Sequence, residues 1–439
     1  MTTTKANVFV FGADEFNLNQ IQALETGHEF SLHPLFDYAD IREQGLQIEV
    51  ERLYQQALNK LDSFTDSVDA IVGYWDFPIS TLLPLLRERY NLPSPSLEAV
   101  LKCEHKYWSR VEQSKVVPEY IPNFCAVDPF AEDYREQISL EYPFWIKPVK
   151  GASSYLAFKV KNDAELDHAI ERIRKAVHRY GSPFNEVLQH ARVPEEVASV
   201  DGNHCLAEGI ISSGRQCTLE GCVLKGQVSV HGIIDSVRAG KHRSSFARYQ
   251  YPSTIPKRVQ KHMLSVTERF LRHIEYDNGP FNIEFYWNRS QDSIRLLEVN
   301  TRISKSHSPL FRKVDGEANH KIMVETALGR DPKFPHRRGK YPVAAKFMWR
   351  VYEDARVTHV PAPEELEAVR RRFRDVDIEL YAEPGKLLST LEDQDSYSFE
   401  LAALFIGAEN QKVLRRKYEE VKAALNIRLE PLHDQPSSH

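Results

Sequence analysis

The sequence predicts an α/β domain with a doubly wound parallel sheet, followed by α+β regions. Two observations lead to this fold class. Apolar runs at 7–11 and 69–75 flank a polar helical stretch at about 43–62, and such strand–helix–strand alternation is typical of a parallel sheet. Later in the chain, strand-like segments dominate residues 197–237 and 280–300, and the second of these has the pattern of a hairpin.

Length and composition exclude several classes of protein. The 439 residues are too many for one core and predict about two to four domains. Hydrophobic residues make up 42% of the chain, but no apolar run reaches the roughly 18 residues that a membrane span needs. The N-terminus lacks the layout of a signal peptide, and a net charge of −5 without a large basic block argues against nucleic acid as a partner. We therefore expect a soluble, cytoplasmic, globular protein with no membrane or nucleic acid partner.

The cysteines and histidines predict neither a disulfide framework nor a zinc site. The five cysteines are an odd number and form no C-x-x-C pair, which favours reduced thiols in a cytoplasm. The histidines are scattered, without the spacing of zinc ligands. The nucleotide signatures G-x-x-x-x-G-K-[ST] and G-x-G-x-x-G are also absent, which argues against Walker-type and dinucleotide-binding folds.

Changes in pattern divide the chain into four predicted domains. The loop NLPSPS at 91–96 ends the first strand–helix pattern, so we place an N-terminal domain at 1–97. The other predicted domains are 98–188, 189–335 and 336–439. The last of these has three alternative roles, which are to complete the preceding domain, to cover a site or to form a homodimer contact.

The remaining elements follow from hydrophobic periodicity and from helix start and stop residues. Helices are predicted at 97–113, 163–180, 256–275 and 408–425, the second of them opened by Asn162-Asp163. Strands are predicted at 143–148, 186–191, 343–351 and 399–406, and a hairpin turn at 224–227. The tail at 433–439 is predicted to be disordered.

The strongest local signal for chemistry is a hairpin at 279–302. By alternation, the first strand presents on one face Asn282, Glu284 and Tyr286. By the same count, the second strand presents on one face Leu296, Glu298, Asn300 and Arg302. A hairpin folded symmetrically about Gln291 sets Glu284 opposite Glu298, with both side chains on the same face.

The opposed glutamates predict a cation between them. Two like charges directly opposed on a sheet are destabilising unless water, a cation or a shared proton separates them. Glu284, Glu298 and Asn300 offer only hard oxygen donors, which suit Mg²⁺, with Mn²⁺ as the alternative ion. Arg302 supplies a fork for a phosphate or carboxylate. The alternative interpretation is the solvated polar face of an ordinary hairpin, and Asn300 and Arg302 in register weaken it.

The motif Glu298-Val-Asn300-Thr-Arg302, preceded by Gly279…Ile283-Glu284-Phe285, resembles the metal-binding hairpin of the ATP-grasp superfamily. That superfamily includes biotin carboxylase, carbamoyl phosphate synthetase, D-alanine–D-alanine ligase and the carboxylate–amine peptide ligases. The resemblance covers most of the chain. It implies that the predicted domains are a pre-ATP-grasp domain, two ATP-grasp lobes (98–188 and 189–335) and a mixed C-terminal region.

The resemblance also implies which residues hold ATP. Lys106 and Lys147 match the two lysines that contact the nucleotide, and Lys147 would reach the α- and β-phosphates. The loop that follows, 150–154, is rich in small residues, so its backbone N–H groups and the hydroxyls of Ser153 and Ser154 can approach phosphate oxygens closely. The alternatives are a solvated surface charge for Lys106 and snorkelling at a strand end for Lys147.

Residues 186–191 resemble the hinge strand whose backbone pairs with adenine. Gln189 stands where the family often has glutamate, and a neutral amide can still accept a hydrogen bond from an exocyclic amine. Glu196 falls where the family places the carboxylate that holds the ribose hydroxyls, and Glu195 is the rival position. Downstream, His307 lies where the substrate pocket begins, and it would contact substrate, orient Arg302 or be a polar loop residue.

The resemblance implies an ATP-dependent ligase with two steps. A substrate carboxylate attacks the γ-phosphorus of ATP to give an acyl phosphate and ADP, and an amine then displaces phosphate to form an amide. Arg302 and Lys147 would stabilise the transferring oxygens. Two alternatives stay open: a biotin-carboxylase-like or carbamate-forming enzyme, and a non-catalytic regulatory protein that binds ATP.

Overall fold

The computed structural model describes residues 5–43, 49–151, 155–239, 245–391, 394 and 398–432. The chain forms two compact units. The first comprises residues 1–231, 255–305 and 319–334, and the second comprises 232–254, 306–318 and 335–439. These limits differ from the four predicted domains, because the second unit takes two short segments from the middle of the chain in addition to its C-terminal part.

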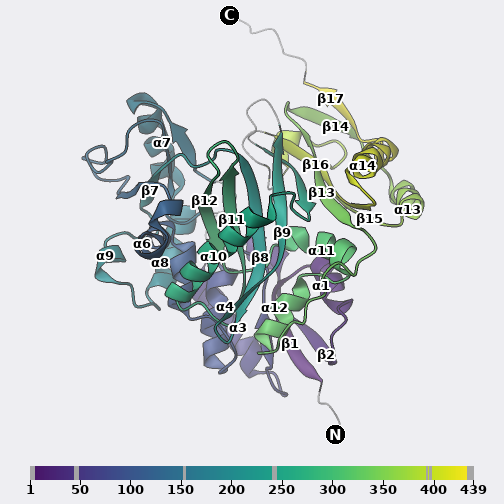
Figure 1. Ribbon diagram of the computed structural model, residues 1–439, viewed down its shortest axis with the longest axis horizontal. Coiled ribbons are helices and arrows are strands. Elements are labelled where there is room, and N and C mark those ends of the chain that lie inside the picture. The colour runs from purple at the N-terminus through teal and green to yellow at the C-terminus, as the bar shows by residue number, and fades with distance from the viewer. Residues whose placement is uncertain are drawn as a thin grey trace, which may run out of the picture. The chain divides into compact units, whose positions relative to one another are not determined.

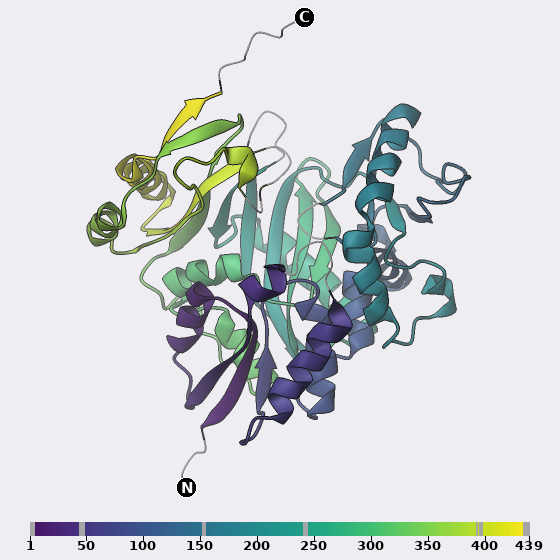
Figure 2. The same cartoon turned by 180° about the vertical axis from the view of Figure 1, so that it is seen from behind.

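The first unit begins with a parallel sheet, as predicted, shown in purple and blue in Figure 1. The order of its strands is β2-β1-β3. Its strands are β1 (Ala6–Ala13), β2 (Phe30–Asp37) and β3 (Ala70–Val72). The accompanying helices are α1 (Glu15–Gln22), α2 (Tyr38–Glu43), α3 (Val50–Asp62) and α4 (Ile79–Arg89). In Figure 2, seen from behind, α3 lies beside this sheet.

Two details of this sheet were not predicted. Strand β2 contains His33 and Pro34 and is only partly buried, so it lacks the apolar run that identifies β1 and β3. It lies at the edge of the sheet, where a proline costs no ladder hydrogen bond. Gly12 does not end β1 but lies within it, at φ +75°, and a Cβ there would be 2.4 Å from Ile79 Cδ1.

The next part of the first unit is a four-stranded antiparallel sheet in the order β4-β7-β5-β6. Its strands are β4 (Phe124–Val127), β5 (Phe144–Pro148), β6 (Phe158–Val160) and β7 (Cys205–Gly209). Its helices are α5 (Leu97–Glu104), α6 (Lys106–Val116), α7 (Asp163–Ala176), α8 (His178–Leu188) and α9 (Glu195–Ala198), with a 3-10 turn at Pro118–Tyr120. Strand β7, which follows residue 188 in the chain, pairs with β4 and β5 in this sheet.

The predicted strand at 186–191 is wrong. Helix α8 runs through this segment to Leu188, and Gln189 is its C-cap. Phe184 and Val187 are buried three residues apart, which is a helical spacing, whereas a half-buried strand would bury every second residue. The helix predicted at 163–180 is confirmed as α7, and the Asn162 side chain caps it by accepting a hydrogen bond from the Glu165 N–H.

The first unit is completed by the strands β12-β11-β8 and the first residues of β9. Their bounds are β8 (Arg215–Leu224), β9 (Gln227–Ala239), β11 (Gly279–Asn288) and β12 (Ser293–Asn300). Two helices belong to this part, α10 (Lys257–His273) and α12 (His320–Ala327). The predicted hairpin turn is confirmed, because Lys225 and Gly226 both have positive φ between β8 and β9.

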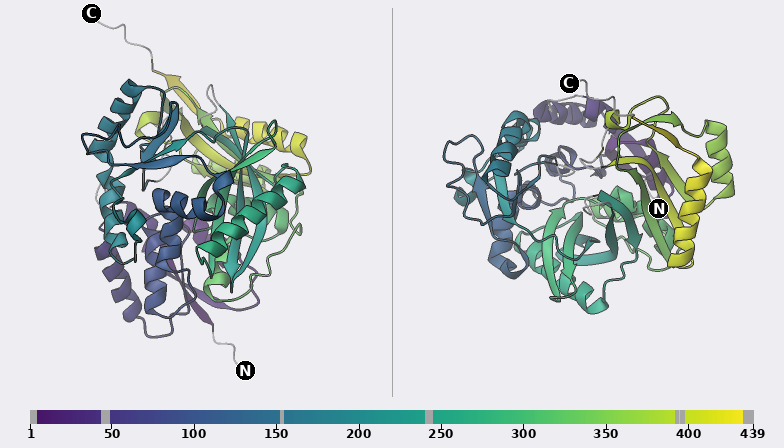
Figure 3. Two further views of the ribbon diagram at one scale, coloured as in Figure 1. Left: turned by 60° about the vertical axis from the view of Figure 1, so that its left-hand side comes forward. Right: turned by 90° about the horizontal axis from the view of Figure 1, so that it is seen from above.

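The second unit contains the rest of β9 and four further strands in the order β10-β13-β16-β15. Their bounds are β10 (Ser245–Tyr251), β13 (Val343–Val351), β15 (Val376–Leu380) and β16 (Phe399–Ala408), and a separate pair is formed by β14 (Ala355–His359) and β17 (Arg428–Pro431). The helices are α11 (Ser308–Asp315), α13 (Pro363–Arg372) and α14 (Gln411–Leu425), with 3-10 turns at Lys305–His307 and Leu388–Thr390. Helix α14 packs on β13 and β16, as Figure 3 shows for the yellow end of the chain.

The strands predicted at 343–351 and 399–406 and the helices predicted at 256–275 and 408–425 are confirmed as β13, β16, α10 and α14. The helix predicted at 97–113 is divided into α5 and α6 at His105. Within the described residues, no helix combines the length and the apolar character that a bilayer span requires. The predicted disordered tail lies outside the described residues.

Candidate active site

Strands β11 and β12 form the predicted hairpin and bring the two glutamates together. Glu284 is the register partner of Glu298, and Asn282 is the partner of Asn300. The four side chains therefore share one face of the hairpin. On its other side β11 pairs with β8, which places Thr218 beside Glu284 and Glu220 beside Asn282. The polar face thus extends over three strands.

A β-bulge in β12 changes the rest of the register. Phe285 pairs with Leu296 and Glu284 pairs with Glu298, so Leu297 is the extra residue. The prediction that Leu296 shares a face with Glu298 is wrong for this reason, because Leu296 follows its partner Phe285 to the buried face. The pairs Glu284–Glu298 and Asn282–Asn300 keep the predicted symmetry about Gln291, whereas the pairs between the bulge and the turn do not.

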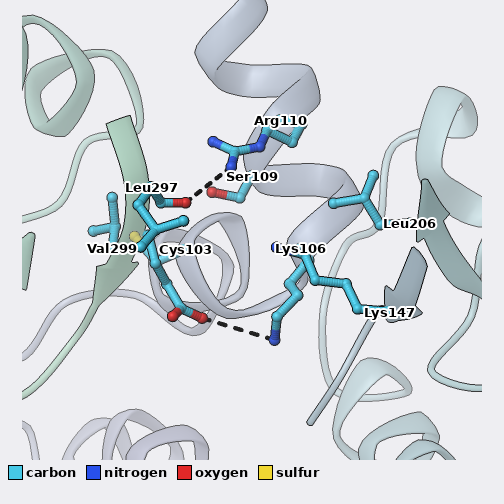
Figure 4. A pocket seen from close by; sticks show the side chains of 9 residues that line it. Cys103, Lys106, Ser109, Arg110, Lys147, Leu206, Leu297 and Val299 are labelled. Carbon is cyan, nitrogen blue, oxygen red and sulfur yellow. Dashed lines mark hydrogen bonds and ion pairs between the residues drawn. The ribbon is translucent and has the colours of Figure 1, made fainter. Parts of the chain in front are cut away.

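Arg110 of α6 holds this bulge. Its Nη1 donates to the carbonyl of Leu296 at 3.2 Å and its Nη2 donates to the carbonyl of Leu297 at 2.9 Å. The guanidinium also donates through Nε to the Glu208 carboxylate at 3.0 Å. Arg110 is 4% exposed and Glu208 3% exposed, so the pair is removed from water. Figure 4 shows Arg110 reaching the Leu297 carbonyl.

Glu208 joins this arginine to the predicted phosphate-binding lysine. The Lys147 ammonium, at the end of β5, donates to the second oxygen of Glu208 at 2.5 Å. Burial alone would raise the pKa of Glu208, but the charges and hydrogen bonds of Lys147 and Arg110 lower it to about 2. Lys147 is therefore fixed through Glu208 to the arginine that holds the β12 bulge. No local sequence signal identified Glu208 or Arg110.

Lys106 lies between Gly151, in the predicted phosphate-binding loop, and Glu298. Its ammonium donates to the carbonyl of Gly151 at 3.2 Å and lies 3.7 Å from a carboxylate oxygen of Glu298. Burial lowers the pKa of Lys106, as do the positive charges of Lys150 and Lys147, while Glu298 acts in the opposite direction. The residue is not the solvated surface charge of the alternative interpretation.

A small cavity separates these groups. It has a volume of about 20 Å³, and its lining includes Lys106, Lys147, Arg110, Leu297 and Glu298. In Figure 4 the side chains of Lys106 and Lys147 point toward it from α6 and β5. Two ammonium groups and a carboxylate thus converge at one point of the first unit.

The predicted metal ligands fit a magnesium ion in donor type. Among the described residues no group of three or more His, Cys, Asp and Glu side chains could hold a metal, so any ion here would use the two glutamates and the Asn300 amide. Glu298 is 43% exposed, and the Lys106 ammonium lies 3.7 Å from its carboxylate, so water or an ion can reach this side chain. Glu284 accepts from Gln216 at 2.6 Å, and Asn300 donates through Nδ2 to Asn282, which leaves its amide oxygen as a potential ligand. Two carboxylates and one amide leave room for substrate phosphates.

Arg302 lies beyond the end of β12 and is bound to the N-terminal sheet. Its Nε and Nη2 donate to the two oxygens of Asp76 at 2.6 and 2.8 Å, which is a bidentate pair. Burial would lower the pKa of Arg302, but Asp76, Glu220 and Glu104 raise it. Asp76 follows β3 at the carboxyl edge of the parallel sheet, where ligands of such sheets bind. Sequence reasoning missed Asp76.

The remaining predicted nucleotide contacts lie elsewhere or are not described. Ser153 and Ser154 lie outside the described residues. Gln189 follows α8, and no strand is present there to act as a hinge. Glu196 lies in α9, half exposed, and binds Lys115 at 2.5 Å. The segment that joins the four-stranded sheet to β8 is instead the chain after β7, at 210–214.

Comparisons with known proteins agree with this architecture. Residues 140–309 match the ATP-grasp domain family. A segment of 143 residues is 29% identical to the carbamoyl phosphate synthase large chain, C-terminal section, of Methanopyrus kandleri; the match covers 32% of this chain and 26% of that protein. The chain therefore spans about a quarter of the length of this curated relative.

Two solved structures share the fold over nearly the whole chain. The L-amino acid ligase from Bacillus licheniformis has a TM-score of 0.69 at 15% identity, covering 98% of this chain and 99% of that one. The biotin carboxylase domain of the Hydrogenobacter thermophilus 2-oxoglutarate carboxylase has a TM-score of 0.60 at 14% identity, covering 97% and 91%. The fold is that of the ATP-grasp ligases. The match of residues 140–309 to the ATP-grasp domain family and the shared fold confirm the resemblance predicted from the hairpin.

Proposed function

We propose that the protein is an ATP-dependent ligase that activates a small-molecule carboxylate as an acyl phosphate and joins it to an amine, releasing ADP and phosphate. The observation that carries the proposal is the pairing of Glu284 with Glu298, because Glu298 also lines a cavity together with Lys106 and Lys147. Asn300 lies on the same face of the hairpin. Oxygen donors next to two ammonium groups suit a magnesium-bound polyphosphate better than any single anion.

Each residue has a role in the proposed reaction. Lys106 and Lys147 bind phosphate oxygens of ATP, and Arg302 binds the substrate carboxylate or the transferring phosphoryl group. Mg²⁺ held by Glu284, Glu298 and Asn300 would neutralise the β- and γ-phosphate oxygens, and Mn²⁺ would suit the same ligands. The carboxylate oxygen attacks the γ-phosphorus and ADP leaves; the amine nitrogen then attacks the acyl carbon and phosphate leaves.

The adenosine contacts of the proposal are Gln189 for adenine and Glu196 for the ribose, with Ser153 and Ser154 at the phosphates. Glu196 is already paired with the Lys115 ammonium, so its carboxylate would have to bind the ribose hydroxyls in addition. The chain after β7, at 210–214, is the rival hinge because it connects the two lobes.

A carboxylating enzyme is the second candidate. It is favoured by the fold shared with the biotin carboxylase domain of Hydrogenobacter thermophilus, whose solved structure is a dimer in complex with MgADP and bicarbonate. Arg302 would then hold bicarbonate in place of an organic carboxylate. A dimer formed through residues 336–439 is part of the proposal, as is a cytoplasmic location, which the five free cysteines favour.

Measuring ADP release separates these candidates. The purified chain is incubated with ATP, Mg²⁺ and either pooled amino acids, a carboxylate with an amine, or bicarbonate. Release that needs a carboxylate and an amine together supports the amine ligase, and a new amide in the mass spectrum identifies the product. Release with bicarbonate alone supports the carboxylating enzyme. ATP binding without release under every condition would leave a regulatory protein.

A further inference from the structure

Lys346 is a buried lysine in the middle of β13, in the second unit. It is 8% exposed. In the sheet register its partners are Tyr249 of β10 and Phe405 of β16, so an aromatic residue flanks it on each side. The ammonium lies 5.4 Å from the centroid of the Phe405 ring. The charge is therefore held in apolar surroundings, where electrostatic attraction is strong.

Among the described residues, the polar partner of this ammonium is a hydroxyl. Lys346 donates to Ser306 Oγ at 3.3 Å, and in the part of the chain that the structure describes no carboxylate forms an ion pair with it. The buried cations of the first unit are different, since Arg110 and Lys147 bind Glu208 and Lys150 binds Glu104. Burying a charge without a counter-charge is costly.

The segment around Ser306 adds further polar groups on the same side of the sheet. His307 is buried, and its ring meets the Tyr249 ring edge-on at 5.0 Å. Ser306 can donate its hydroxyl hydrogen when its oxygen accepts from Lys346, and a histidine ring can also donate. An ammonium, a hydroxyl and an imidazole therefore gather beside one strand pair.

We propose that Lys346, Ser306 and His307 form a binding site for an oxyanion of a small molecule, either a carboxylate or a phosphate group. The anion supplies the counter-charge that the described protein does not. A role of this site as a substrate subsite rests on the proposed ligase function. The observation that favours this role is that Ser306 follows Arg302 by only four residues in the chain. The binding of an anion does not rest on it.

Thermal unfolding of three proteins tests the site: the unaltered chain, Lys346→Met and Lys412→Met. Lys412 is an exposed lysine of α14 and serves as the matched control for loss of one charge. Without added anion, Lys346→Met should unfold about 2–4 °C higher than the unaltered chain, because methionine fills the same space without a buried charge. Lys412→Met should unfold at the same temperature as the unaltered chain.

Added anions give the second readout. Succinate and inorganic phosphate are titrated separately, and at least one of them should raise the unfolding temperature of the unaltered chain and of Lys412→Met in a saturable way. The response that saturates should be lost in Lys346→Met; a response to succinate alone identifies a carboxylate site, and one to phosphate alone identifies a phosphate site.

Three outcomes would overturn the site: an anion response that survives in Lys346→Met, no saturable response to either anion, or a Lys346→Met protein that unfolds at a lower temperature. Failure of the ligase proposal is separate, because it would be seen as absent ADP release while the anion response persists. If both proposals hold, Lys346→Met should also lower substrate-dependent ADP release at least about 10-fold, with a larger effect on KM than on kcat.

Discussion

The first unit contains two groups of charged residues that differ in how deeply they are buried. Lys147, Glu208 and Arg110 form a buried chain with hydrogen bonds of 2.5 and 3.0 Å. Glu284 and Glu298 face each other across the β11–β12 pair, and among the described residues the Lys106 ammonium lies 3.7 Å from Glu298. The first group pairs its charges away from water, whereas Glu298 of the second group is 43% exposed.

The difference shows how the site divides its tasks. A closed network costs little further free energy to hold in place, so it can fix Lys147 and the β12 bulge before any ligand arrives. Opposed carboxylates repel each other and gain most from a cation. We therefore expect changes in the buried chain to affect folding first, and changes in the open pair to affect ligand chemistry first.

The largest effect is expected for Arg110→Met. It leaves the Glu208 carboxylate buried with Lys147 alone and removes both donors from the Leu296 and Leu297 carbonyls. We expect a loss of about 3–5 kcal/mol in the free energy of unfolding, measured by urea denaturation. The control is Arg135→Met, which breaks an exposed pair with Asp167 and should leave the midpoint unchanged. Equal urea midpoints for Arg110→Met and Arg135→Met would show that the buried network adds no more stability than the exposed pair.

Glu298→Gln should affect chemistry with little effect on folding. The side chain is 43% exposed, so we expect an unaltered urea midpoint. Loss of one carboxylate from the ion site should lower Mg²⁺-dependent ADP formation by about 10²–10³-fold. Glu136→Gln, on an exposed loop, is the matched control. Turnover of Glu298→Gln at the rate of the control would show that the metal assignment is wrong.

Acid should weaken the buried chain in a defined range of pH. The folded pKa of Glu208 is about 2, below the ordinary value of 4.5, so its contribution to stability is complete above pH 4.5 and is lost as the pH falls toward 2. The contribution is on the order of 3 kcal/mol. Unfolding free energies of the unaltered chain and of Glu208→Gln, compared between pH 5 and pH 2, should therefore converge. Parallel curves would contradict the low pKa.

The smallest effect is expected for Glu196→Ala. A ribose contact binds ground state and transition state alike, so we expect the KM for ATP to rise by about 3- to 10-fold with a smaller change in kcat. Steady-state ADP release at varied ATP measures both. An unchanged KM would favour Glu195 or the chain after β7 as the nucleotide contact, and Glu195→Ala run in parallel would distinguish these two.

Sequence reasoning identified the hairpin because both of its signals are local. The parity of Glu284 and Glu298 and the turn between them lie within 20 residues, and the pairing is confirmed. The bulge was not predicted. Its sign in the sequence is the doublet Leu296-Leu297, which interrupts the alternation of apolar and polar residues. Two consecutive apolar residues in a strand do not reveal which of them is the extra one.

The supporting network could not be predicted from the sequence. Arg110 and Glu208 are 98 residues apart, and Asp76 and Arg302 are 226 residues apart. Such pairs form only when separate elements pack, and no periodicity within one element reports on them. The wrong prediction of a strand at 186–191 has a local cause. A short apolar segment considered without its neighbours does not distinguish a strand from the end of a helix.

The bulge at Leu297 has a consequence for how this chain tolerates changes of length. If Leu297 were deleted, Phe285 would still face Leu296 and Glu284 would still face Glu298, so the acidic pair would survive the loss of a residue. A residue inserted between Glu298 and Asn300 would instead turn one of these two side chains to the opposite side of the sheet. Relatives aligned to this chain can therefore carry a one-residue gap at 297 and retain the site, whereas a gap two residues later would separate its ligands.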